Sequence, residues 1–253
     1  MKKPAPIIAL IVLTTTVSIS LFKIKPSPNL NNQIKDIKQN IPKIIDTIVP
    51  QPTKILETGL PDQHLIKTTF VPQSPKKNWD QPWQDACEEA ALLTVDFYYK
   101  NQQPSLDQIE QSIQSMIEFE TQQGWTKDVN LTQMATISSQ YLGYQTKIID
   151  HPTIEIIKKY LAQDTPIIIP ASGKILFQEN THFRSGGPYY HNLVILGYND
   201  QRQQFTVHDV GTQFGAYFRY SYQVLMDSIH DFPDSNQKED IALGNKKVLI
   251  LLK

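Results

Sequence analysis

The hydrophobic pattern of the chain changes its period near Pro166, and this change limits the folds that the chain can adopt. Before Pro166, apolar residues recur at helical spacing and predict helices near residues 87–100, 105–122, 131–141 and 153–163. After it, short apolar or alternating runs predict strands at residues 166–170, 191–198, 204–209, 217–220 and 247–252. A loop is expected over residues 171–188 and a short helix over 222–229. Helices first and an antiparallel sheet later predict an α+β domain, with the N-terminal helices packed on the sheet.

Cys87 is the only cysteine among the 253 residues, and it stands where the first predicted helix begins. In the first turn of a helix, unpaired N–H groups and the positive end of the helix dipole favour a thiolate. The adjacent acids Glu88 and Glu89 oppose that thiolate, so a reactive Cys87 needs a cationic partner. A lone cysteine is otherwise a small buried apolar residue. One cysteine also excludes an intramolecular disulfide and a cysteine-rich zinc cluster.

The strands at residues 191–198 and 204–209 flank a turn at 199–202 and predict a β-hairpin. The pair His191 and Asp209 is centred on residue 200, which lies inside this turn. We therefore expect the two residues to face each other, within a register error of one or two, with Cβ atoms about 4.5–5.5 Å apart. His208 precedes Asp209 and should point to the opposite face of the sheet.

Each of these residues also has a purely structural explanation. His191 is a polar residue at a strand start, and Asp209 is an acid before a turn. A helix-start thiol, a histidine and an orienting acid together are instead typical of thiol proteases. A metal site formed by His182, His191 and Asp209 is an alternative, but no metal-ligand spacing is evident. We expect neither a metal nor a cofactor.

Several stretches of the chain together identify a family. They are FVPQSP at 70–75, NW at 78–79, WQDACEEA at 83–90, LTQMA at 131–135, GPYYHNLVI at 187–195, HDVGT at 208–212 and YSY at 220–222. With them, residues 68–252 resemble the bacterial peptidase C39-like branch of the papain-fold cysteine peptidases. The resemblance implies a papain-like fold, with Cys87 as nucleophile, His191 as base and Asp209 as the acid that orients it.

The family also uses a glutamine upstream of the cysteine as an oxyanion donor, and this chain offers three. Gln73 stands at the family's position, and we favour it. Gln81 has the papain-like spacing, six residues before the cysteine, and Gln84 lies closest in sequence. The donor must reach the developing oxyanion, so the sequence leaves this choice open. Two departures from the family, Ser74 for Ala and Val210 for Pro, remove no reacting group.

The first 22 residues predict a membrane anchor. Lys2 and Lys3 precede a charge-free run at residues 4–22, and Lys23 and Lys25 follow it. The run lacks a clear small-x-small cleavage site, so we expect an uncleaved signal-anchor with the rest of the chain outside the cytoplasm. A cleaved signal peptide and a secreted protein are the alternative.

Residues 23–65 contain six prolines and predict a stalk or linker, followed by the peptidase-like domain at residues 66–253. Within the stalk, apolar residues from Leu30 to Ile48 follow the 3–4 spacing of a heptad seam, which Pro42 interrupts. This pattern fits an amphipathic segment resting on the membrane or on the domain. A short oligomerising stalk is the other interpretation.

The charge balance restricts the partners. With 24 basic and 25 acidic residues the formal net charge is -1, which argues against nucleic-acid binding. We expect a membrane-tethered or exported cysteine peptidase that hydrolyses peptide or amide bonds in a peptide or protein substrate. Two alternatives use the same fold: a non-catalytic peptide-binding module, against which the intact Cys, His and Asp argue, and an acyltransferase.

Overall fold

The computed structural model describes residues 59–125 and 128–253. The predicted anchor and the stalk up to residue 58 lie outside the described residues, as does the heptad-like spacing within the stalk. Within the described part of the chain, no helix has the length and apolar character needed to cross a membrane. From Gly59 to Lys253 the chain forms one compact unit.

Seven strands form one sheet, in which all pairings are antiparallel. The order is β2-β7-β3-β4-β5-β6, and β1 pairs with the end of β4. The bounds are Gln63–Leu65 for β1, Gln145–Asp150 for β2, Ile167–Ser172 for β3, Tyr190–Asn199 for β4, Gln204–His208 for β5, Phe218–Ser221 for β6 and Lys247–Leu252 for β7. Every residue of β3 and all but the last residue of β4 are buried, which explains their continuous apolar runs.

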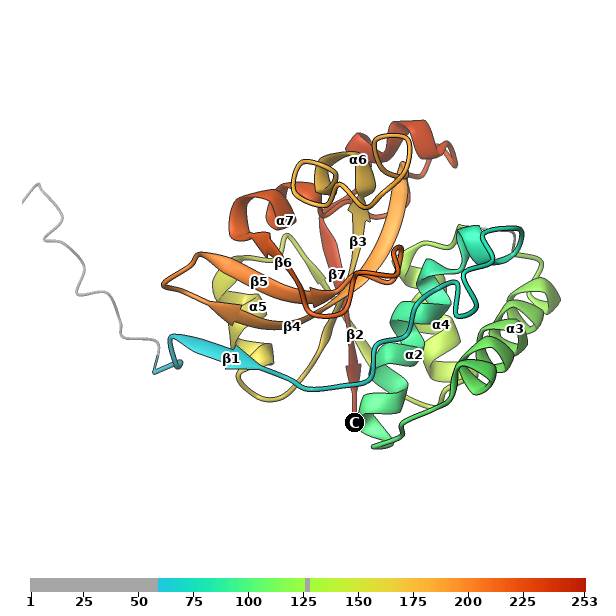
Figure 1. Cartoon of the computed structure of the whole chain (residues 1–253), viewed down its shortest axis with the longest axis horizontal. Helices are drawn as coiled ribbons and strands as arrows, with labels where there is room; N and C mark the ends of the chain where they lie inside the picture. Colours follow the sequence, from blue (N-terminus) through green and yellow to red (C-terminus); the bar gives the residue numbers. More distant parts are fainter. Residues whose placement is uncertain (1–58, 126–127) are drawn as a thin grey trace, which may run out of the picture. The chain divides into compact units, whose positions relative to one another are not determined.

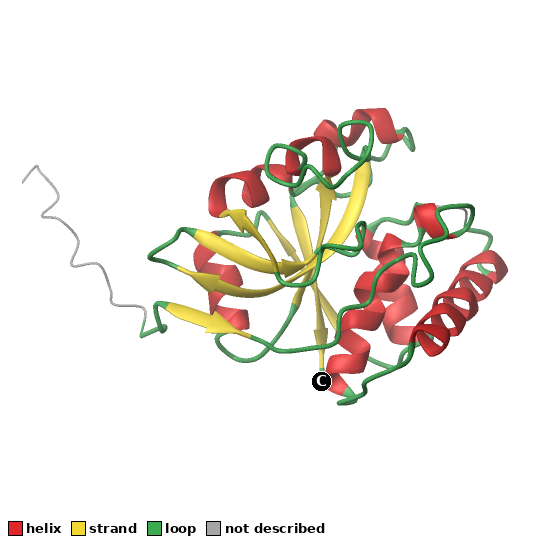
Figure 2. Ribbon diagram, viewed as in Figure 1, coloured by secondary structure: helices red, strands yellow, loops and turns green. Residues whose placement is uncertain are grey.

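The helices lie on both sides of these strands. They are α2 at Cys87–Tyr99, α3 at Leu106–Gln122, α4 at Leu131–Gln140, α5 at Ile154–Leu161, α6 at Gly173–Leu176 and α7 at Tyr222–Ser228, with short 3-10 turns at Trp83–Asp85 and Lys238–Leu243. Figure 1 shows α2, α3 and α4 on one side of the strands and α5 and α7 on the other. Figure 2 shows the strands between these two groups of helices. The predicted α+β architecture is confirmed.

The N-termini of the first helices differ in how they are capped. Ser105 and Asn130 each form a capping box at the start of α3 and α4. At the start of α2 the capping position is Ala86, which offers no side-chain acceptor. No capping side chain therefore accepts from the N–H groups of the first turn of α2, the turn in which Cys87 stands.

Besides the two 3-10 turns, three short elements were not predicted from the sequence. The segment expected as a loop at 171–188 contains the end of β3 and the four-residue α6. β2 was not predicted, because it is an edge strand with exposed polar residues and a weak alternation. Residues 63–65, predicted as the end of the stalk, form β1 and lie in the sheet. Three residues are too few to show a strand period.

The β4–β5 hairpin contains a β-bulge. Next to the turn, Tyr198 pairs with Phe205, whereas beyond the bulge Ile195 pairs with Val207. The register shifts between Ile195 and Gly197, so Leu196 is the additional residue on β4. The hairpin itself was predicted correctly.

Candidate active site

A cavity of about 550 Å³ lies among the described residues where α2 and β4 begin. Cys87 and His191 both line it, together with Gln73 and Gln84. Its other walls are aromatic, basic and acidic, and include Trp79, Asp128, Arg184, Tyr189, Phe214 and Lys238. α2 packs directly on β4, so the two elements that carry Cys87 and His191 are in contact.

Cys87 is the first residue of α2 and is only 5% exposed. Its thiol donates to Glu88 Oε2 at 3.0 Å, and Asn192 Nδ2 donates to the sulfur at 3.9 Å. Burial raises the pKa of the Cys87 thiol well above its ordinary value, and the carboxyls of Glu88 and Asp128 raise it further. A thiolate at this position therefore needs a cation or a hydrogen-bond donor beside it.

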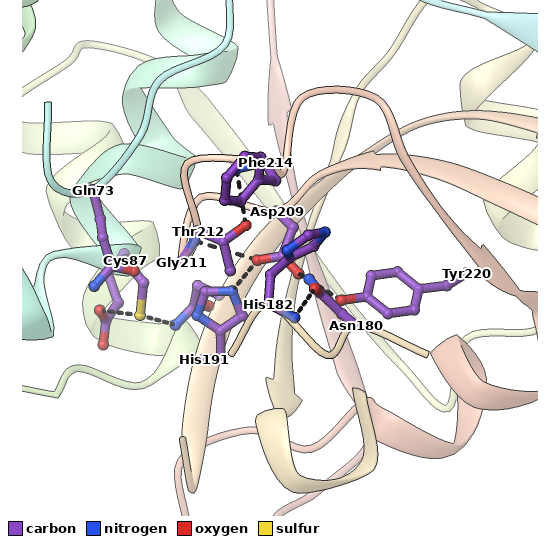
Figure 3. Close-up of polar contacts among 12 residues, drawn as sticks. Gln73, Cys87, Asn180, His182, His191, Asp209, Gly211, Thr212, Phe214 and Tyr220 are labelled. Atoms are coloured by element: carbon purple, nitrogen blue, oxygen red, sulfur yellow. Dashed lines mark hydrogen bonds and ion pairs between the residues drawn. The ribbon is translucent and has the colours of Figure 1, made fainter. Parts of the chain in front are cut away.

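His191 and Asp209 form a buried pair. His191 Nε2 lies 2.8 Å from Asp209 Oδ1, and the two side chains are 2% and 0% exposed. In Figure 3 the His191 ring lies between the side chains of Cys87 and Asp209. A proton on Nε2 directed at the carboxylate leaves Nδ1 as the basic nitrogen of the ring. The ring of Phe183 packs edge-on against His191, with centroids 5.3 Å apart.

Asp209 is held by three further donors. Tyr220 Oη and Asn180 Nδ2 donate to Oδ2 at 2.5 and 2.9 Å, and the Gly211 N–H donates to Oδ1 at 3.2 Å. Burial alone would raise the pKa of Asp209, but His191, Tyr220 and Asn180 together lower it. The carboxylate therefore stays ionised and fixes the orientation of the imidazole. Asn180 and Tyr220 were not singled out from the sequence as site residues.

The hairpin brings His191 and Asp209 together as predicted, although the register differs from the predicted one. Beyond the bulge, His208 pairs with Val194, a shift of two residues from pairing centred on residue 200. A shift of two leaves side chains on the same face, so the contact is retained. His208 packs edge-on against the rings of Phe70 and Tyr217, and burial lowers its pKa to about 3.

The three candidate glutamines have different surroundings. Gln73 lines the cavity and is buried, and its Nε2 donates to the backbone carbonyls of Trp83 and Gln84 at 3.0 and 3.1 Å. Gln84 also lines the cavity and is exposed. Gln81 donates to Asp85 at 2.6 Å and is not among the described residues that line the cavity.

The metal alternative has no support from the geometry. The ring of His182 lines the cavity, but it stacks on Phe214 with centroids 4.5 Å apart. Among residues 59–125 and 128–253, no group of three or more His, Cys, Asp or Glu side chains is placed to hold a metal ion.

Three buried glutamates, Glu88, Glu89 and Glu120, lie near the start of α2 and the end of α3. Burial raises the pKa of Glu88 and Glu89 well above the ordinary value, and each is raised further by neighbouring acids. Burial also raises the pKa of Glu120 to about 7. Since acids with raised pKa values bind more protons in the folded state, they stabilise the fold in acid.

We expect thermal stability to fall as the pH rises from about 4.5, the ordinary pKa of a Glu carboxyl, to about 7, the pKa of Glu120 in the folded protein. The loss should be on the order of 3 kcal/mol, since the pKa rises from 4.5 to about 7 and one pKa unit corresponds to roughly 1.4 kcal/mol. Melting temperatures measured across this range check it. Glu120→Gln should flatten the dependence, whereas Glu118→Gln, at an exposed position on the same helix, should not. Equal curves for both variants and the parent would contradict the assignment.

Comparisons with known proteins give the family of the chain. The model of the Peptidase C39 like family matches residues 65–232. Among 13 matching solved chains is a putative C39-like peptidase from Bacillus anthracis, with 13% sequence identity and a TM-score of 0.32. That alignment covers 49% of this chain and only 60% of the Bacillus chain. Xylellain, a cysteine protease from Xylella fastidiosa, has 12% identity and a TM-score of 0.46, with 79% of this chain and 90% of xylellain covered.

A comparison with curated proteins found no match. The family match nevertheless spans both the helix that begins with Cys87 and the hairpin that carries His191 and Asp209. It agrees with the papain-like cysteine peptidase fold that the resemblance implied, in which helices precede an antiparallel sheet. Because the match covers more than half of its residues, the chain belongs to the peptidase C39-like family.

Proposed function

We propose that this protein is a cysteine peptidase that hydrolyses peptide or amide bonds with Cys87 as nucleophile, His191 as base and Asp209 as orienting acid. One observation carries the proposal: a helix-start cysteine and a histidine paired with a buried aspartate line the same cavity. These are the three groups that thiol-based acyl chemistry requires.

The proposed reaction follows from the protonation states. Asp209 holds the Nε2 proton of His191, so Nδ1 accepts the proton of the Cys87 thiol. The thiolate attacks the substrate carbonyl carbon, and the imidazolium then gives its proton to the leaving amine. Water, activated by the same imidazole, hydrolyses the thioester and restores the thiol.

The oxyanion would form beside the start of α2, where no N-cap side chain accepts from the backbone N–H groups. We propose Gln73 as the side-chain donor, because it is buried in the cavity wall beside Cys87. Its two Nε2 hydrogens contact the carbonyls of Trp83 and Gln84, so one of these contacts must be exchanged or shared when the oxyanion forms.

We expect Gln73→Ala to lower kcat by about 10²–10³, because the transition state loses one oxyanion donor. KM should change little, since the oxyanion is absent from the bound substrate. Steady-state kinetics checks both values. Gln84→Ala is the matched control, at an exposed position in the same cavity. A larger loss of kcat in Gln84→Ala than in Gln73→Ala would show that Gln84 is the oxyanion donor.

The location of the enzyme is also a proposal. The charge-flanked run at residues 4–22 supports a membrane-tethered protein with its domain outside the cytoplasm. Membrane fractionation with external protease digestion tests it. Recovery of a soluble form that begins near residue 22 would show that the run is a cleaved signal peptide and not an anchor.

Reaction with a thiol-directed electrophile tests the function without knowledge of the substrate. At neutral pH iodoacetamide should alkylate Cys87 faster than free glutathione, and a peptide aldehyde should protect it. A non-catalytic binding module would show neither property. With a cleavable peptide, acyl transfer would be recognised by conjugation to an added amine in preference to release of the free acid.

A further inference from the structure

The sulfur of Cys87 has a carboxyl group as its neighbour. Glu88 Oε2 lies 3.0 Å from Sγ, and the Glu88 side chain is 1% exposed. The other carboxyl oxygen, Oε1, accepts the backbone N–H of Val129 at 3.1 Å. Tyr190 in turn donates to the Val129 carbonyl at 3.0 Å, which links this carboxyl to the start of β4.

The titratable groups around Glu88 come from four parts of the fold. Cys87 and Glu89 belong to α2, Glu120 to α3, and Asp128 to the segment before α4, while β4 contributes Tyr190, and His191 on the cavity side. Burial raises the pKa of Glu88 most, and the charges of Asp128 and Glu120 raise it further. Glu88 therefore keeps its proton in the folded protein at mildly acid pH.

The position of that proton follows from the hydrogen bonds. Oε1 faces an N–H group, so it must act as an acceptor. The carboxyl proton is thus on Oε2, the oxygen in contact with the sulfur. When the thiol loses its own proton to His191, the direction of this contact reverses, and Oε2–H donates to the thiolate.

We propose that protonated Glu88 is a further catalytic residue, which donates a hydrogen bond to the Cys87 thiolate and makes the sulfur more nucleophilic than it is when Glu88 is ionised. Ionised Glu88 would instead place a negative charge 3.0 Å from the sulfur, so the thiol would retain its proton. This inference rests on the proposed function, because it concerns the nucleophile assigned there.

The test is the rate of Cys87 alkylation by iodoacetamide as a function of pH, measured by mass spectrometry on the full chain. In the parent protein the rate should be high in acid and fall by roughly tenfold to a hundredfold as Glu88 ionises, the loss of one charge-assisted hydrogen bond. Glu88→Gln keeps an acceptor for Val129 and an N–H donor for the sulfur. The Glu88→Gln variant should be alkylated severalfold more slowly than the parent in acid, because an amide is a weaker donor. Its alkylation rate should no longer fall as the pH rises.

Glu89→Gln is the matched control, since Glu89 is the next residue of α2 and equally buried. This substitution removes the same ionisable group without touching the sulfur, so the alkylation rate of Cys87 should still fall as the pH rises. Parallel profiles for the parent and Glu88→Gln would overturn the inference and leave the proposed function standing. A parent rate that only rises with pH would also overturn it, even if Glu88→Gln fails to fold. A Cys87 no more reactive than glutathione at any pH would refute the proposed function itself.

Discussion

Cys87→Ala is expected to abolish turnover, with a loss on the order of 10⁴-fold or more in kcat, because no other group can form the thioester. The fold should survive, since alanine is the best helix former and Cys87 contributes only a small buried side chain. Hydrolysis of a broad peptide library checks the activity, and a melting curve checks the fold.

His191→Ala should be about as damaging, because the thiolate then loses both its counter-ion and the acid that protonates the leaving amine. The Cys87→Ala/His191→Ala double variant should lose no more than either single variant, since the two residues act as a unit. Undiminished hydrolysis by Cys87→Ala would remove the basis of the proposed mechanism.

Asp209→Asn is the second change with a large expected effect, a fall in kcat on the order of 10²–10⁴. Four donors converge on the two carboxylate oxygens of Asp209, from His191, Gly211, Asn180 and Tyr220. The amide that replaces the carboxylate has one NH2 group. This group must face either the two donors at Oδ1, His191 and the Gly211 N–H, or the two donors at Oδ2, Asn180 and Tyr220. Turned toward His191, it would impose the tautomer with Nδ1 protonated, which cannot accept the thiol proton.

Asp231→Asn provides the matched control for Asp209→Asn. Asp231 is also buried and accepts backbone N–H groups, from Leu131 and Phe232, but it lines a different cavity. Its replacement should lower the melting temperature and leave kcat nearly unchanged. Steady-state kinetics and melting curves separate the effect on kcat from the effect on stability. Equal losses of kcat in both variants would show that Asp209 only stabilises the fold.

The long elements were predictable because their burial leaves a period in the sequence. The apolar positions Ile109, Ile113 and Met116 of α3 repeat at helical spacing and are all buried. The six residues of β3 are all buried, and the first five, 167–171, read as one apolar run. The strands β1 and β2 leave no such signal, the first because it is short and the second because its outer edge is exposed.

The site was predictable only in part. The sequence indicated that Cys87, His191 and Asp209 could act together, and the structure places Cys87 and His191 at one cavity and Asp209 behind His191. Tyr220 and Asn180 reach Asp209 from β6 and from the segment after α6, so only tertiary packing reveals them. The direction of the Glu88 carboxyl was also hidden, because adjacent residues of a helix do not ordinarily face each other.

The single additional residue at the bulge, Leu196, decides whether Asp209 lies on the same face of the sheet as His191. Without the additional residue, the pairing next to the turn would continue, and Asp209 would stand opposite Val194, on the face away from His191. With it, Val194 pairs with His208, and Asp209 returns to the face of His191. A one-residue deletion in a strand of this hairpin would therefore turn Asp209 away from the imidazole without altering any residue of the site. Insertions or deletions confined to the turn would leave the pairing of the two strands, and so this contact, unchanged.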